Sequence, residues 1–402
     1  MTPYHVYLAT RFVEAFLFTS IVTVNLVYQV TIVQLNPLQL VLVGTLLETV
    51  CFLSEIPTGL LADIHSRKWS TIIGVILIGL GFVVEGSFPT FLFVMLAQII
   101  WGIGAAFVSG AREAWITDEI GENKANNVFL QAEQLAQFGA MIGIVISVAL
   151  ASVYIQLPII LGGVLYSIWG ICLSFIMKEE HYHPTPKDER PGWKHLMHTF
   201  LDSINVVKKH HVLLIIMAIG CILGMFSEGF DRLWTPYMLQ FHFPTIGHFK
   251  PIIWFGIISL VGMMLTIIAT EISKRKVNVN SHQRVARALL AINALLACSV
   301  ILFGLAGNFT WAVVAYWLVY FLREVNGPLY NAWLNQNISS NIRATVFSMS
   351  SQANALGQMI LGPITGLVAT LFSLQAALIM AGTILLPIIA LYLFTIKTHK
   401  LE

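Results

Sequence analysis

Apolar stretches separated by short polar or turn-forming segments repeat along the whole chain. Each stretch is long enough to cross a bilayer as a helix, which needs about 20 residues. Breaks such as Asn36-Pro37 and Gly307-Asn308 carry turn-forming residues. Twelve spans are predicted, over 6–33, 38–61, 70–87, 90–115, 127–155, 158–177, 212–239, 250–271, 284–306, 309–334, 344–370 and 372–396. The pattern therefore predicts an all-α integral membrane protein.

Composition agrees with lipid as the surrounding solvent. The 402 residues are 57% hydrophobic and 10% charged, whereas soluble domains carry about 25% charged residues. So few charges cannot cover a surface that faces water. The four cysteines lie in apolar stretches without close pairing, so we expect neither a disulfide framework nor a metal site.

Lysine and arginine positions give the orientation. With a cytosolic N-terminus, seventeen of the 22 lie in inner loops or the C-terminal tail and only Lys250 lies in an outer loop. The other four lie within spans: Arg11, Arg112, Arg232 and Arg323. Cytoplasmic loops are enriched in these residues. Both termini are therefore expected in the cytosol.

The longest hydrophilic stretch divides the chain into two halves. Residues 1–178 are predicted to form an N-terminal six-helix bundle and residues 211–402 a C-terminal one. Residues 179–210 are predicted to be a cytosolic linker containing an amphipathic helix from Trp193 to Lys209. Five of the twelve histidines fall in this region and His211 follows it directly, but without compact ligand spacing, so we interpret it as a solvated linker.

The two halves resemble each other in sequence. Residues 114–129 align without gaps on 332–347, with six identities in sixteen positions at an offset of 218. Both segments join the fourth span of a half to the fifth. Because each half has six spans, the repeats run in the same direction and are parallel repeats about an axis along the membrane normal.

The loop between the second and third spans carries a recognisable motif, from Gly59 to Lys68. It resembles the major facilitator superfamily signature Gly-x-x-x-Asp-x-x-Gly-Arg-Lys, with Ser66 in place of the second glycine. The preceding Glu55-Ile-Pro-Thr-Gly resembles bacterial drug-efflux (drug:proton antiporter) members. The resemblance implies the major facilitator fold and a cytosolic gating motif in which Arg67 pairs with an acid at the end of span four. Its expected members are Gly59, Asp63, Arg67, Lys68, Asp118 and Glu119. The alternative is that Arg67 and Lys68 only determine topology.

Two further family signatures are incomplete. The stretch from Gln98 to Ala106 resembles the proton-coupling motif Arg-x-x-Gln-Gly-x-Gly-Ala-Ala, but Gln98 occupies the arginine position. The stretch from Gly139 to Ile144 lacks the proline of the antiporter motif. Gly362-Pro363 appears in span eleven, where close helix packing is the simpler interpretation. Antiport is therefore an expectation that these motifs support only in part.

Ionisable residues within spans are the candidate functional groups. Each costs roughly 2.5–3.5 kcal/mol to insert, so such residues usually face a cavity or pair. The proton-coupling candidates, chosen by depth, are Glu48, Glu228 and Glu324. The substrate-cavity candidates are Asp231, Arg232, Arg323, Trp317 and Tyr320. In the family, spans one, four, seven and ten line the central cavity. The alternative is a structural ion pair, such as Arg323 with Glu228.

These features predict a secondary active transporter that exports small amphipathic molecules, drugs among them, by proton-coupled alternating access. We expect no cofactor beyond the proton gradient and no nucleic-acid partner. We also expect a monomer in the cytoplasmic membrane of a bacterium. A carrier for a nutrient, lipid or metabolite, with or without proton coupling, is the alternative. A membrane-embedded enzyme is remote because no phosphate-binding loop, His-Glu-x-x-His or Gly-x-Ser-x-Gly motif is present.

Overall fold

The computed structural model describes residues 1–182, 211–244, 250–276, 282–338 and 343–398. All regular secondary structure within these ranges is α-helical, which confirms the all-α prediction. The predicted amphipathic helix from Trp193 to Lys209, and the histidines around it, lie outside the described residues.

The described residues divide into two compact units. Unit 1 comprises Met1–Leu35, Leu46–Arg190 and Ile246–Leu260, and unit 2 comprises Asn36–Thr45, Pro191–Thr245 and Val261–Glu402. The helices α2 (Pro37–Ile64) and α10 (Pro251–Lys276) each contribute residues to both units.

Unit 1 contains most of the first six predicted spans. Besides the larger part of α2, its helices are α1 (Pro3–Thr31), α3 (Arg67–Ser87), α4 (Phe91–Val108), α5 (Ala111–Ile120), α6 (Glu122–Ala151) and α7 (Leu157–Ile176). The fourth predicted span is interrupted between α4 and α5, where Gly110 has a φ of 73°. A left-handed residue cannot continue a right-handed helix, and glycine adopts this conformation without steric cost. The break is therefore local.

Unit 2 contains most of the last six predicted spans. Its helices are α9 (His211–Met238), the rest of α10, α11 (His282–Gly304), α12 (Phe309–Asn337), α13 (Arg343–Leu371), α14 (Leu374–Ile384) and α15 (Leu386–Thr398). The last predicted span is divided into α14 and α15 at Leu385. Pro387, which lacks an N–H group, stands in the first turn of α15, where that group has no partner within the helix.

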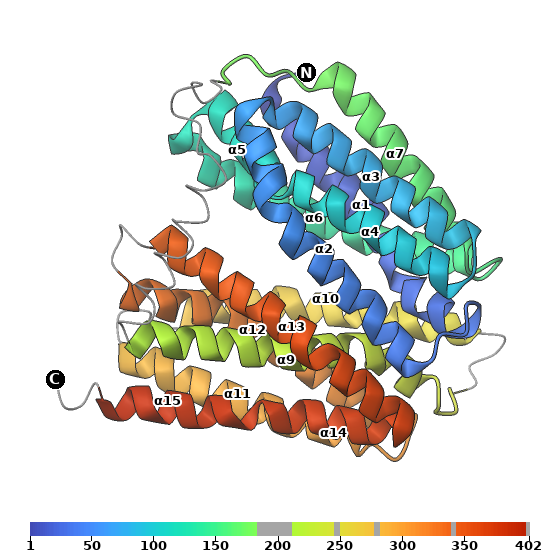
Figure 1. Ribbon diagram of the computed structural model, residues 1–402, viewed down its shortest axis with the longest axis vertical. Coiled ribbons are helices and arrows are strands. Elements are labelled where there is room, and N and C mark those ends of the chain that lie inside the picture. Colours follow the sequence, from blue (N-terminus) through green and yellow to red (C-terminus); the bar gives the residue numbers. More distant parts are fainter. Residues whose placement is uncertain (183–210, 245–249, 277–281, 339–342, 399–402) are drawn as a thin grey trace. The chain divides into compact units, whose positions relative to one another are not determined.

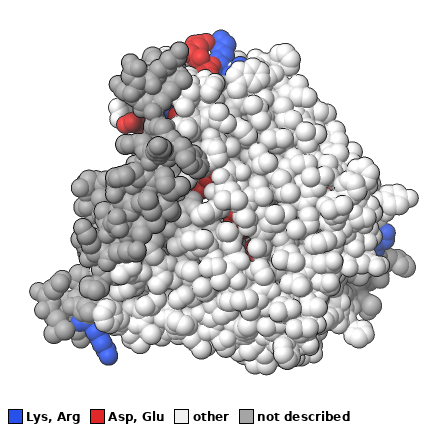
Figure 2. Space-filling view, viewed as in Figure 1, with Lys and Arg blue, Asp and Glu red and all other residues white. Residues whose placement is uncertain are grey.

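The helices have the length and surface of membrane spans. In the part of the chain that is described, eleven are long and apolar enough to cross a bilayer when α4 joins α5 and α14 joins α15. The twelfth, α12, has the length, but Arg323, Glu324 and Asn326 make it more polar. Figure 2 shows a face almost without charged side chains. Large apolar side chains are exposed, Phe175 by 83%, as expected where helices contact lipid.

One helix pair recurs in each unit, formed by the first and fifth spans of a half (Figure 1). In unit 1, α6 brings Gly139 against α1, where an added Cβ would lie 2.6 Å from the carbonyl oxygen of Phe12. In unit 2, α13 brings Gly357 against α9, where an added Cβ would lie 2.0 Å from the carbonyl oxygen of Cys221. Gly139 and Gly357 are separated by 218 positions, which is the offset of the sequence repeat. The helix pair thus recurs at the spacing that the two predicted repeats require.

Candidate functional site

An aromatic column runs along one side of α9 in unit 2. Phe226, Phe230 and Trp234 follow one another at intervals of four residues, so they share a face of the helix. Tyr316 of α12 lies against this face, with its ring centroid 4.5 Å from that of Trp234 and 6.2 Å from that of Phe230. Tyr320, one turn further along α12, stacks on Tyr316 at 6.2 Å. Phe226 and Phe230 are buried, at 1% and 2% exposed, so the partly exposed rings of the column are Trp234, Tyr316 and Tyr320.

An ion pair lies beside the aromatic column. The two guanidinium nitrogens of Arg323 donate to the two carboxylate oxygens of Asp231, at 2.5 and 2.9 Å. The Arg323 guanidinium also lies over the ring of Phe226, 5.5 Å from its centroid. The side chains of Arg323 and Asp231 are 32% and 46% exposed. This arrangement offers a negative group, a positive group and aromatic faces at one place.

Arg323 pairs with Asp231, whereas Glu228 pairs with Arg232. Glu228 is 4% exposed, and its carboxylate accepts from Nε of Arg232 at 3.2 Å, one turn along α9. A Cβ added at Gly362 of α13 would lie 3.0 Å from Cγ of Glu228, and one added at Gly44 of α2 would overlap its Oε1. Glu228 is therefore enclosed by closely packed helices, and Gly362 takes part in that packing.

The other predicted residues are placed as follows. Tyr320 and Trp317 are partly buried in α12, and Tyr320 faces Gly262 of α10. Glu324 is partly buried beside Arg323. Glu48 is partly buried in the portion of α2 that belongs to unit 1. Unit 2 thus brings Asp231, Arg323 and Tyr320 together.

At the start of α3 in unit 1, Arg67 is the centre of a polar network. Its guanidinium donates to Asp118 of α5 at 2.5 Å and to the carbonyl oxygen of Ala114 at 3.2 Å. A longer contact of 3.5 Å reaches Asp63, at the end of α2. Arg67 therefore joins α2, α3 and α5. Gly59, in the same motif, has open space around its Cα.

The residues that follow α7 bind to the same loop. Glu119 accepts from the backbone N–H groups of Glu180 and His181 at 2.8 and 3.0 Å. Glu179 accepts from the hydroxyl of Ser66 at 2.5 Å and from the N–H of Lys68 at 2.9 Å. The two acids at the end of α5 therefore differ, because Asp118 binds Arg67 and Glu119 binds the start of the linker.

Ser66 stands where the family signature has glycine, and its hydroxyl makes two contacts that glycine could not make, with Glu179 and with the N–H of Trp69. It is the N-cap of α3 and accepts from the N–H of Trp69 at 3.1 Å. Tyr182 donates its hydroxyl to the carbonyl oxygens of Asp63 and Ala62, at 2.7 and 3.1 Å. Burial raises the pKa of Tyr182, and the nearby carboxylates of Glu179 and Asp63 raise it further. The hydroxyl therefore stays protonated and able to donate at neutral pH.

Among the described residues, the most enclosed arginine ion pair also lies in unit 1. Arg112 of α5, 12% exposed, binds Glu14 of α1, 6% exposed, and also Glu113 at 3.0 Å. Arg11 reaches Glu133 of α6 at 2.9 Å. These pairs connect α1, α5 and α6, which agrees with a structural interpretation of the charges in spans one and four.

Two groups of side chains were not predicted from the sequence. The first is the aromatic column, for which the four-residue spacing from Phe226 to Trp234 was an available signal. The second is a buried cluster in which the amide nitrogens of Gln29 and Gln98 donate to the carboxylate of Glu85, at 2.7 and 3.1 Å. Glu85 lies close to the end of its span, which made it resemble an interfacial residue.

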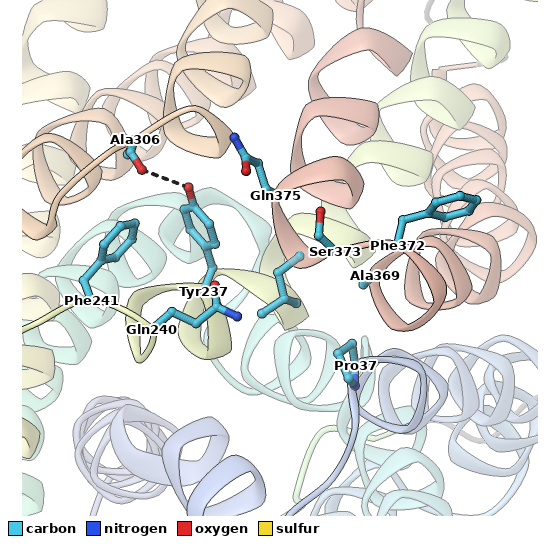
Figure 3. A pocket seen from close by; sticks show the side chains of 10 residues that line it. Pro37, Tyr237, Gln240, Phe241, Ala306, Ala369, Phe372, Ser373 and Gln375 are labelled. Atoms are coloured by element: carbon cyan, nitrogen blue, oxygen red, sulfur yellow. Dashed lines mark hydrogen bonds between the residues drawn. The ribbon is translucent and has the colours of Figure 1, made fainter.

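Unit 2 has a separate open pocket of about 500 Å³ at the ends of α9 and α13 (Figure 3). Tyr237 lies in its wall and donates to the carbonyl oxygen of Ala306 at 3.2 Å. The pocket contains none of the residues predicted from the sequence. Among the described residues, no group of three or more metal-binding side chains occurs.

Comparisons with known proteins agree on one family. The profile of the Major Facilitator Superfamily matches residues 8–360. An uncharacterised MFS-type transporter, YxaM of Bacillus subtilis (strain 168), is 26% identical over 367 residues, which cover 88% of this chain and 86% of the relative.

Solved structures share the fold. The nucleoside transporter NupG is 14% identical with a TM-score of 0.79, over 98% of each chain. A bacterial homolog of the human lysosomal transporter Spinster is 15% identical with a TM-score of 0.78, over 99% of this chain and 98% of the other. A POT family transporter in complex with 5-aminolevulinic acid is 15% identical with a TM-score of 0.75, over 98% and 96%.

Proposed function

Since the chain belongs to the Major Facilitator Superfamily, we propose that it is a secondary active transporter that exports small amphipathic molecules, drugs among them, by proton-coupled alternating access. It acts as a monomer in the cytoplasmic membrane of a bacterium, with both termini in the cytosol. No cofactor takes part, and the proton gradient supplies the energy.

The observation that carries this proposal is the Asp231–Arg323 pair beside the aromatic column. A charged pair within spanning helices is costly to insert, yet here both side chains stay partly exposed. An amphipathic molecule satisfies such a surface, because its apolar part stacks on Tyr316 and Tyr320 while its polar part competes for the pair. Asp231 would attract a cationic group and Arg323 an anionic one, which suits zwitterions and cations.

Proton coupling is supported by the acids within the spans. Glu48, Glu228 and Glu324 are our candidates because burial disfavours the charged form of a carboxylate. Arg232, the partner of Glu228, is part of this proposal because it stabilises the ionised carboxylate. Release of that pairing would accompany uptake of a proton. The network around Arg67 is proposed to hold one cytosolic conformation, so that its rearrangement accompanies each transport cycle.

A dye-efflux and resistance panel in cells expressing the protein tests the proposal. We expect lower dye accumulation and higher resistance to lipophilic cations, both abolished by a proton uncoupler. Asp231→Asn or Arg323→Ala should lower efflux at least about tenfold, because each leaves the other charge without its partner. Glu122→Gln, at an exposed carboxylate on α6, is the matched control and should transport normally.

The alternative carriers give different results. If no dye or drug is exported but the purified protein moves nucleosides, peptides or lipids in liposomes, the export proposal is wrong and the carrier alternative holds. Nucleosides and peptides enter the panel because the transporters of similar fold include a nucleoside transporter and a peptide transporter, and lipids enter as a class that the carrier alternative includes. Efflux that continues undiminished in the presence of an uncoupler would contradict proton coupling.

A further inference from the structure

Three spanning helices of unit 1 bring three polar side chains together away from solvent. Gln29 of α1, Glu85 of α3 and Gln98 of α4 are each 0% exposed. The two amide nitrogens donate to different oxygens of the carboxylate, Gln29 to Oε1 at 2.7 Å and Gln98 to Oε2 at 3.1 Å. Tyr28 fixes the backbone at the same place, since its hydroxyl donates to the carbonyl oxygen of Glu85 at 2.7 Å.

The helices packed against α3 bring few ionisable groups to this level. Neither α4 nor α7 contains Asp, Glu, Lys, Arg or His, and α1 contains none after Glu14. The charged residues of α5 lie near the other end of α3, where Arg67 binds Asp118. Glu85 is eighteen residues from Arg67, about 27 Å along a helix. Tyr28 of α1 is a titratable group that contacts Glu85, through the backbone carbonyl oxygen of Glu85, and α7 adds Tyr166 and Cys172 along its length.

Glutamine suits this site because its amide group both donates and accepts. With Glu85 ionised, the two N–H donors satisfy the carboxylate, as observed. The remaining amide oxygens, Oε1 of Gln29 and Oε1 of Gln98, are buried and have no hydrogen-bond partner in the described part of the chain. With Glu85 protonated, rotation of either amide would offer that oxygen to the new O–H group. The cluster can therefore satisfy both forms of the carboxyl group.

Arginine at position 98 would act differently. The sequence of α4 around Gln98 resembles a family motif that has arginine there, and a guanidinium group donates but never accepts. It would stabilise only the ionised carboxylate. The combination of a buried glutamate with glutamine in place of arginine thus points to a carboxyl group that changes its protonation state.

We propose that Glu85 is a reversible proton-binding site, with Gln29 and Gln98 as positioning residues that stabilise its two forms in turn. On binding, an O–H bond of a hydronium ion breaks as the carboxyl O–H bond of Glu85 forms, and on release the carboxyl O–H bond breaks as the proton returns to water, so no other bond changes. The further claim that this proton drives transport rests on the proposed function. The claim that Glu85 binds a proton is independent of it.

Infrared difference spectroscopy on the purified full chain tests the binding without any substrate. Between about pH 5 and about pH 9, a band from a protonated carboxylic acid should appear on acidification, since buried carboxyl groups titrate in this range. Glu85→Gln should lose that band, and Glu122→Gln should keep it. Absence of an acid band that depends on Glu85 would overturn the proposal.

Substitutions at position 98 test the positioning role. Gln98→Leu removes one donor to the ionised form, so the midpoint of the band should move to higher pH by about one unit or more. Gln98→Arg should move it to lower pH or remove the band from the range. A midpoint that stays unchanged in both variants, while each keeps the thermal stability of the unaltered protein, would exclude Gln98 from the site.

Transport measurements then separate the two proposals. In liposomes, Glu85→Gln should lose at least about tenfold of pH-driven uphill transport but retain exchange of substrate across the membrane, because exchange requires no net proton movement. If the band titrates and uphill transport is unchanged, Glu85 binds a proton that does not drive transport, and its role in coupling is wrong. If the carboxylic-acid band of Glu85 is absent while uphill transport persists, the proposed function holds and the proposal that Glu85 binds a proton is wrong.

Discussion

Two adjacent cations at the start of α3 make different contacts. Arg67 binds Asp118, Asp63 and a backbone carbonyl, and its side chain is 23% exposed. The ammonium group of Lys68 lies over the neighbouring ring of Trp69, 5.7 Å from its centroid. Both residues belong to the family signature, but within the described part of the chain the side-chain network of Arg67 includes another helix, whereas the Lys68 contact stays within α3.

Arg67→Gln should therefore slow transport, whereas Lys68→Gln should not. Loss of the charge releases Asp118 and removes the connection between α3 and α5, which changes the relative free energies of the conformations in the cycle. We expect a fall of roughly threefold to tenfold in the rate, since partly exposed ion pairs contribute about 1 kcal/mol. Initial rates of substrate efflux at equal membrane expression measure it. Equal rates in the two variants would reduce the loop to a topology signal.

The sequence revealed those site residues that conflict with their surroundings. Asp231 and Arg323 stood out because charges are rare in apolar spans, and the structure brings them together. Glu85 was equally anomalous but lay near a predicted span end. Gln98 carried no charge and was visible only as a departure from a motif. The sequence could not predict which acid pairs with Arg323, because Asp231 and Glu228 are three residues apart and either could reach it.

At the scale of helices, the close approach of α9 and α13 depends on glycine. An added Cβ at Gly357 would lie 2.0 Å from the carbonyl oxygen of Cys221 and 2.9 Å from the N atom of Met225. Both are backbone atoms, so no side-chain rotation relieves the overlap. Gly59 in α2 has nothing within 4 Å of an added Cβ and provides a matched control in another spanning helix.

Gly357→Ala should destabilise the protein and Gly59→Ala should not. The helices must separate in the first variant, and because the overlapping atoms are backbone atoms the cost lies toward the upper end of roughly 1–3 kcal/mol. That cost exceeds the gain of about 1 kcal/mol from replacing glycine by alanine in a helix. At Gly59 the added Cβ meets no other atom, so only the stabilisation from replacing glycine by alanine applies. Thermal unfolding in detergent, followed by circular dichroism, measures both. A Gly357→Ala protein as stable as the Gly59→Ala protein would show that the backbones are not in close contact.

At the scale of the whole molecule, the fold was largely predictable because each span corresponds to a continuous apolar stretch of the sequence. The breaks within spans were not. Gly110 interrupts the fourth span and Leu385 the twelfth, yet neither disturbs the local hydropathy. The division of α2 between two units was also invisible, since packing partners on a helix are set by tertiary contacts rather than by its own pattern.

Orientation in the membrane follows from the distribution of lysine and arginine, seventeen on one side and one on the other. Cationic loops resist translocation, so we expect the richer side to be cytosolic. Single cysteines in a background lacking Cys51, Cys172, Cys221 and Cys298 test this. In intact cells, a membrane-impermeant maleimide should label Asn308→Cys, in a predicted outer loop, but label Lys124→Cys only after the membrane is opened. Both positions are exposed, so differences in local burial do not explain the result. Labelling of Lys124→Cys in intact cells would reverse the orientation and place the Arg67 network on the outside, where it could not act as a cytosolic gate.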